Sequence, residues 1–148
     1  MKRRTFAAAF VALLAFVPTA HAAAPAGEPT LPAAEWTTIR KVIDDQLAAL
    51  KAGDGPTAMT YAAPGIRAQF RTPENFLRMV RNGYAPLLGA SYTVYLDGAV
   101  VNGAVIQPLR LVMPDNTVLV ALYTMQRQPD GGWRIAGCVI APSTVQAT

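Results

Sequence analysis

Histidine, the side chain that most often moves protons in enzymes, occurs once in the 148-residue chain, at His21. The rest of the chain therefore lacks the residue needed for a Ser-His-Asp triad, a Cys-His pair or an imidazole metal site. Cysteine also occurs once, at Cys138, within the apolar run WRIAGCVI. Apolar neighbours predict a buried structural thiol there, neither a nucleophile nor a disulfide partner.

Tyrosines and one arginine are the remaining candidates for a site. Tyr61, Tyr84, Tyr95 and Tyr123 are spread across the chain, and a tyrosine hydroxyl can act as an acid or an oxyanion donor. Arg67 follows a Pro-Gly turn and is the arginine most expected to face a cleft. We predict Tyr61, Arg67, Tyr84 and Tyr95 as ligand-binding residues, with no catalytic and no metal-binding residue. The alternative for the tyrosines is core packing with the hydroxyl at the rim.

A cluster of arginines offers a second, weaker signal. Arg67, Arg71, Arg78 and Arg81 fall in one stretch with only Glu74 among them. Such a group can bind phosphate, carboxylate or lipid headgroups. The alternative, which we favour, is a solvated helical face with one Glu74–Arg78 pair four residues apart.

Carboxylates give no support for an enzyme. The aspartates lie at expected caps, turns and solvated faces, and none is embedded in an apolar run where burial would raise its pKa. A glycine-rich phosphate loop and a cysteine cluster are also missing from the sequence, so no cofactor is expected. A hydrolase or isomerase using Tyr with Asp or Arg is therefore the last-ranked alternative.

The first residues predict an export signal. Lys2-Arg3-Arg4 precedes an uncharged apolar run, and Ala20-His21-Ala22 fits a cleavage site between Ala22 and Ala23. We expect residues 1–22 to be a cleaved signal peptide, which predicts a periplasmic or secreted protein with no stable membrane anchor. The general secretory and twin-arginine routes both stay open.

Removal of that signal changes the charge balance. The chain has 13 basic and 9 acidic residues, and three of the basic ones belong to the signal. Ten basic residues then face nine acidic ones, so basicity gives no argument for nucleic-acid binding.

Helical patterns fill the first half of the remaining chain. Trp36, Ile39 and Ile43 begin an apolar stripe over residues 32–50. Asp54-Gly55-Pro56 and Thr72-Pro73-Glu74 each place a capping side chain before a proline, which predicts two further helix starts. Residues 65–70 can add another helical turn, and Tyr84-Ala85-Pro86 is expected to carry the chain across to a sheet.

From Ser91 onward the period is that of strands. Asn102-Gly103 predicts a two-residue hairpin between residues 99–101 and 104–106. Pro108 cannot donate to a ladder, so it predicts an edge or a bulge. A long hairpin is predicted around Pro129-Asp130-Gly131-Gly132.

Together these patterns predict one α+β domain, with N-terminal helices packed on one face of an antiparallel sheet of about four strands. A flexible lead (23–31) precedes the domain (32–141), and a tail (142–148) follows it. On the last strand, alternation predicts that Trp133 and Ile135 share one face, while Arg134, Ala136 and Cys138 share the other.

Two segments carry a family resemblance. QPLRL with ALYTMQRQPDGGWRIAGC, and IRAQFRTPENFLRMVRNGYAPL in the middle, resemble the bacterial family called domain of unknown function 4864. The resemblance implies a cone-shaped fold of the nuclear-transport-factor-2-like (cystatin-like) type, and it implies no activity. Because such folds host many functions, function must be argued from the site.

Three functions remain open. The first is a non-catalytic exported module that holds a small apolar or amphipathic ligand in the cone. The second is a homo-oligomer, such as a homodimer, or a partner-binding module that uses one face of the sheet, which predicts an exposed apolar patch there. The third is the enzyme named above.

Overall fold

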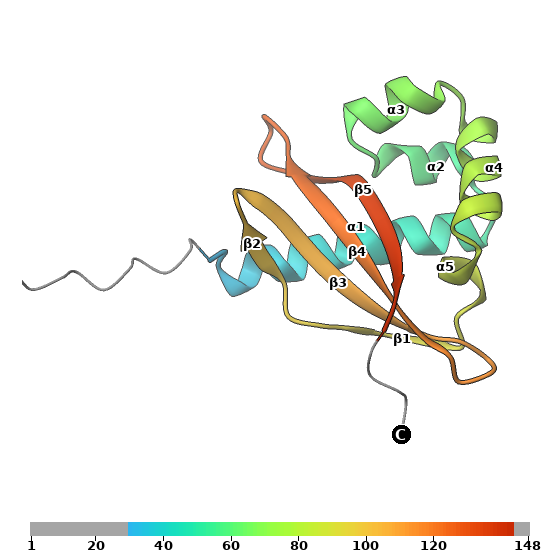
Figure 1. Ribbon diagram of the computed structural model, residues 1–148. Coiled ribbons are helices and arrows are strands. Elements are labelled where there is room, and N and C mark those ends of the chain that lie inside the picture. Colours follow the sequence, from blue (N-terminus) through green and yellow to red (C-terminus); the bar gives the residue numbers. More distant parts are fainter. Residues whose placement is uncertain (1–29, 144–148) are drawn as a thin grey trace, which may run out of the picture.

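The computed structural model describes residues 30–143, which form a helical layer on one side of a single sheet (Figure 1). The predicted signal peptide, most of the lead and most of the tail lie outside the described residues. The helices are α1 (Ala33–Lys51), α2 (Gly55–Thr60), α3 (Pro64–Phe70), α4 (Pro73–Gly83) and α5 (Ala85–Gly89). The strands are β1 (Tyr92–Tyr95), β2 (Ala99–Val101), β3 (Ala104–Val112), β4 (Val118–Arg127) and β5 (Trp133–Pro142).

The predicted helix starts are confirmed by their caps. The Asp54 carboxylate accepts from the Thr57 amide at 3.1 Å, and the Thr72 hydroxyl oxygen accepts from the Asn75 amide at 3.2 Å. Each bond satisfies one of the amides that a helix leaves free at its N-terminus. Helix α5 was not predicted. Its proline, Pro86, lies in the first turn, where the missing N–H costs nothing.

All strand pairs are antiparallel, in the order β1-β3-β4-β5, with β2 also pairing with β3. The hairpin at Asn102-Gly103 is confirmed, and both residues have positive φ angles of 49° and 79°. The long β4–β5 hairpin is also confirmed, and Gly131 turns it with φ 84°. The sheet has five strands where about four were predicted, and the three-residue β2 is the short arm of the predicted hairpin at Asn102-Gly103.

Pro108 lies inside β3, at the break between β1 and β2, where residues 96–98 stand opposite residues 107–108, three against two. This irregularity agrees with the predicted edge or bulge at Pro108. On that side of β3 the Pro108 carbonyl accepts from the Leu96 amide at 3.2 Å. No ladder amide is needed there, since β1 has ended and β2 has not begun. The side chain of Gln107 donates to the Leu96 carbonyl at 2.8 Å instead.

A bulge opposite Thr124 and Met125 corrects the predicted faces of β5. Met125 pairs with Ile135, whereas Thr124 pairs with Gly137, so Ala136 is the extra residue. The insertion shifts the alternation by one position. Cys138 therefore shares the helix-covered face with Trp133 and Ile135, rather than lying on the opposite face.

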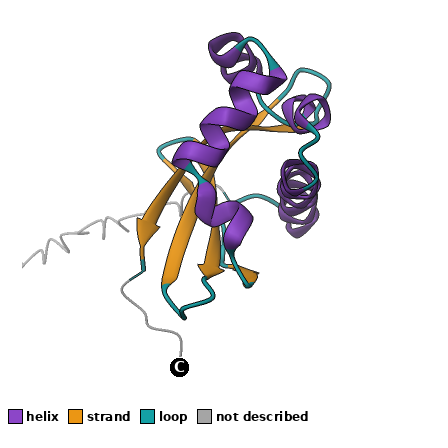
Figure 2. Cartoon of the chain, turned by 90° about the vertical axis from the view of Figure 1, so that its right-hand side faces the viewer, coloured by secondary structure: helices purple, strands orange, loops and turns teal. Residues whose placement is uncertain are grey.

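The core lies between the helices and one face of the sheet, the inner face (Figure 2). Ile39 and Ile43 from α1 are fully buried there, as is Leu111 from β3. Each such side chain stabilises the fold by about 1.5–3 kcal/mol through removal from water. The two layers agree with the predicted α+β class. Within residues 30–143, none of the helices has the length and apolarity needed to cross a membrane.

Candidate functional site

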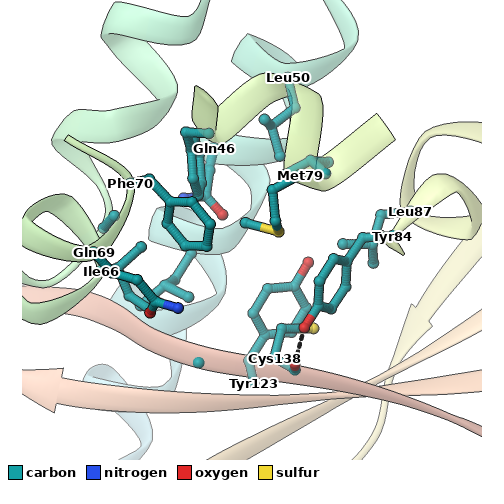
Figure 3. A pocket seen from close by; sticks show the side chains of 15 residues that line it. Gln46, Leu50, Ile66, Gln69, Phe70, Met79, Tyr84, Leu87, Tyr123 and Cys138 are labelled. Atoms are coloured by element: carbon teal, nitrogen blue, oxygen red, sulfur yellow. Dashed lines mark hydrogen bonds between the residues drawn. The ribbon is translucent and has the colours of Figure 1, made fainter. Parts of the chain in front are cut away.

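A cavity of about 250 Å³ lies between the helices and the inner face of β4 and β5 (Figure 3). Its wall is mostly apolar and includes Leu50, Ile66, Phe70, Phe76 and Met79. These residues come from α1, α3 and α4, and Leu87 adds α5, so four helices and the sheet form the wall. The wall residues are far apart in the sequence, so no single sequence motif predicts the cavity.

The helix-side wall follows from the sequence of α4. After the Thr72 cap, Phe76, Met79 and Val80 recur at spacings that place them on one helical face. Phe70 at the end of α3 packs against Phe76 with ring centroids 5.9 Å apart. Arg71, between the two helices, adopts φ 63°, and this sharp turn lets both aromatic rings face the same space.

One polar wall residue comes from α1. Gln46 lies three residues after Ile43, within the apolar stripe, and is buried. Its Nε2 donates to the Ala58 carbonyl at 3.2 Å. In Figure 3 the amide oxygen lies on the cavity side. The cavity therefore has a buried hydrogen-bond acceptor in a mostly apolar wall, whose other amide, Gln69 on α3, lies at an exposed position.

A second polar group enters from the sheet. Tyr123 of β4 is 1% exposed, and among the described residues its hydroxyl has no hydrogen-bond partner. The ring rises from the sheet with the hydroxyl on the cavity side, below Met79 (Figure 3). Burial raises the pKa of Tyr123 well above its usual value, so the hydroxyl is a protonated donor at neutral pH.

Cys138, opposite Tyr123 in the sheet register, is half-buried in the same wall. Burial raises the pKa of the Cys138 thiol to about 12, so the thiol is protonated at neutral pH. The Tyr84 hydroxyl donates to the Cys138 carbonyl at 2.9 Å. That bond ties the start of α5 to β5.

The wall contains no Asp, Glu, Lys or Arg. Its titratable groups, Tyr84, Tyr123 and Cys138, offer no carboxylate base, and the thiol is not activated. Among the described residues, no group of three His, Cys, Asp or Glu side chains could hold a metal ion. The geometry suits the holding of an apolar molecule with a small polar part.

The family model of a domain of unknown function, DUF4864, matches residues 32–148. The chain belongs to the DUF4864 family. The match covers most of the chain and includes every element of the described fold, so the resemblance of the two quoted segments is confirmed. A search of the curated proteins found no match. The nuclear-transport-factor-2-like type of this DUF4864 domain stays a prediction.

Of the four predicted ligand-binding residues, only Tyr84 lines the cavity of the DUF4864 domain. The Tyr95 hydroxyl donates to Asp44 Oδ1 at 2.8 Å and joins β1 to α1 away from the cavity. Burial is the main cause of the raised pKa of Tyr95. Tyr61 is half-buried just after α2, and Arg67 is exposed on α3. The structure does not bring these four residues together.

The arginine stretch is exposed along α3 and α4. Arg78 Nη1 donates to Asn75 Oδ1 at 3.3 Å, so it does not form the expected pair with Glu74. The ion pairs found among residues 30–143 are Lys41–Asp45 and Arg127–Glu35. An anion-binding role for the arginines stays a prediction.

Sequence reasoning missed Gln46 entirely and did not select Tyr123. A signal existed for Gln46, since an uncharged polar residue inside an apolar helical stripe must find a buried partner. For Tyr123 the deciding fact is its hydroxyl's lack of a partner, which depends on elements far away in the sequence.

Proposed function

We propose that this DUF4864 domain is a non-catalytic module that binds a small apolar or amphipathic ligand in the cavity. The single observation that carries the proposal is an uncharged, mostly apolar cavity of about 250 Å³ walled by four helices and the sheet. The cavity is partly open to solvent, so an apolar molecule could enter it and leave water without the fold opening.

The volume sets the size of the ligand. An engineered apolar cavity of about 150 Å³ takes benzene, and drug-sized ligands need about 300–1,000 Å³. The cavity here lies between those limits. It suits a bicyclic or short-chain molecule, with apolar contact supplying most of the affinity.

The test is native mass spectrometry of the purified protein, with two variants that add the same side chain at different places. Ile66→Trp puts an indole at the cavity wall, whereas Ala68→Trp puts it on the exposed side of the same helix. We expect a copurifying small molecule in the wild type and in Ala68→Trp, and its loss in Ile66→Trp. A ligand-free spectrum for all three proteins would count against the proposal.

The proposal also locates the module outside the cytoplasm, in the periplasm or the medium. The support is the sequence of residues 1–22, with its basic start, apolar run and Ala20-His21-Ala22 site. N-terminal sequencing of the protein recovered from its native cells should begin at Ala23. Recovery of the chain with an intact residue 1 in the cytoplasm would contradict this part of the proposal.

One observation favours a second candidate, a homodimer formed through the sheet face that the helices leave uncovered, the outer face. Tyr92, Val94, Leu122 and Val139 lie there and are 38–63% exposed. An apolar face on one side of a sheet can be covered by the same face of a second copy, because a two-fold interface is self-complementary. X-ray scattering should then give twice the monomer mass, and Val139→Lys should halve it. A monomer at all concentrations would remove this candidate.

A further inference from the structure

The buried Tyr123 hydroxyl is hard to explain by folding alone. It lies on the inner face of β4, is 1% exposed, and has no hydrogen-bond partner among the described residues. A buried polar group without a partner destabilises a fold, and phenylalanine would fill the same shape without that cost. The hydroxyl therefore calls for a role other than packing.

The hydrogen bonds of the other polar residues in the wall indicate that this role lies in the cavity. Tyr84, the other tyrosine of the wall, donates its hydroxyl proton to the Cys138 carbonyl at 2.9 Å, so it is not available as a donor to a ligand. Gln46 Nε2 donates to the Ala58 carbonyl, and the amide oxygen of Gln46 lies on the cavity side (Figure 3). Among the buried residues of the wall, Tyr123 thus offers a hydroxyl donor and Gln46 an acceptor, whereas the Gln69 amide lies at an exposed position on α3.

We infer that the ligand is an uncharged molecule with an apolar body and one oxygen, a carbonyl or hydroxyl, that accepts a hydrogen bond from Tyr123. This inference rests on the proposed function and narrows it to a ligand class. The absence of any charged side chain from the wall argues against a carboxylate or ammonium ligand, because a buried charge needs a partner. Apolar contact provides affinity, and the Tyr123 bond provides selectivity.

Three probes that share one ring system separate these contributions: naphthalene, 2-naphthol and 2-naphthoate. In calorimetric titrations of the purified protein at neutral pH, we expect 2-naphthol to bind about tenfold more tightly than naphthalene, the ratio typical of one additional hydrogen bond. The anionic 2-naphthoate should bind more weakly than either neutral probe.

Tyr123→Phe should abolish the preference for 2-naphthol and leave the affinity for naphthalene unchanged. Tyr95→Phe is the matched control, since it removes a tyrosine hydroxyl that bonds Asp44 outside the cavity, and it should keep the preference. The melting temperature of Tyr123→Phe should be equal to or above that of the wild type. A clear decrease would mean that the hydroxyl has a partner in the protein and would overturn the inference.

The remaining outcomes separate this inference from the proposed function. Equal binding of the two neutral probes, unchanged by Tyr123→Phe, would overturn the inference and leave a ligand-binding cavity in place. Tightest binding of 2-naphthoate would also overturn it. Failure of every probe to bind would count against both the inference and the proposed function.

Discussion

Cys138 and Tyr123 owe their protonation states to their position on the inner face of the sheet. They pair across β4 and β5, and both contribute to the cavity wall. Burial raises the pKa of each side chain, so both are protonated at neutral pH. A protonated thiol is a weak nucleophile, and it adds to the wall as a small apolar group.

We predict slow labelling of the Cys138 thiol in the native protein. With an aromatic disulfide reagent at pH 8, we expect the native rate to be about a hundredfold or more below that of the urea-unfolded chain, because thiolate is scarce at a pKa of about 12. The native rate should keep rising with pH above 9, where an ordinary thiol levels off. Rapid stoichiometric labelling of native protein at pH 7 would contradict the raised pKa.

Gln107 has a structural role, because its side chain takes part in several hydrogen bonds. It is fully buried in β3, accepts from Arg40 Nε at 3.2 Å, and donates to the Leu96 and Pro108 carbonyls at 2.8 and 2.9 Å. Its amide thus replaces the ladder bonds that are missing beside Pro108.

Gln107→Leu should lower the free energy of unfolding by about 1–3 kcal/mol, because buried polar groups lose their partner. Gln126→Leu, at an exposed position on β4, should change it by less than about 0.5 kcal/mol. Urea unfolding of the three proteins makes the comparison. Equal urea midpoints for the wild type and Gln107→Leu would show that the hydrogen bonds of Gln107 contribute nothing to stability.

At the scale of elements, α1 is fastened to the β4–β5 hairpin by a three-residue contact. Trp133 Nε1 donates to Glu35 Oε2 at 2.7 Å, and Arg127 Nη2 lies 3.0 Å from Glu35 Oε1. The Arg127 guanidinium also lies over the Trp133 ring, 4.5 Å from its centroid. The Trp133 hydrogen bond, followed by the bond from Arg127, lowers the pKa of Glu35.

A lowered folded-state pKa means that the ionised form of Glu35 stabilises the fold. This contribution is fully present above the usual value of 4.5 and is lost as the pH falls through the folded value. Glu35→Gln has no carboxylate to protonate, so the variant lacks this pH-dependent loss of stability. The difference in urea midpoint between wild type and variant should therefore be largest at pH 7 and shrink below about pH 4. A difference that stays constant from pH 7 to 3 would show that the charge is not involved.

The elements that sequence predicted well are those with local chemistry. Asp54 and Thr72 cap helices with bonds three residues away, and Asn102-Gly103 forms its turn from its own permissive φ angles. The failure on β5 is non-local, because the bulge at Ala136 that reverses the predicted face of Cys138 depends on the pairing with β4. The cavity shares this difficulty, because Gln46 and Tyr123 meet only after the helices fold over the sheet.

At the scale of the molecule, the sheet has two faces with different surroundings. The inner face is covered by helices and holds the cavity, while the outer face leaves Leu122 and Val139 exposed. The two proposals therefore use opposite faces of one sheet. They are compatible, since covering the outer face with a second copy would leave the cavity wall untouched.

The measurement that tests the central claim most directly is a naphthalene titration of protein labelled with ¹³C at its methionine methyl groups, followed by NMR. Met79 lines the cavity, whereas Met113 packs near Gly89, outside the wall. If the cavity binds ligands, the Met79 methyl signal should shift in a saturable way while that of Met113 stays in place. Saturable movement of Met113 alone, or no movement of Met79 up to the solubility limit of naphthalene, would contradict the account.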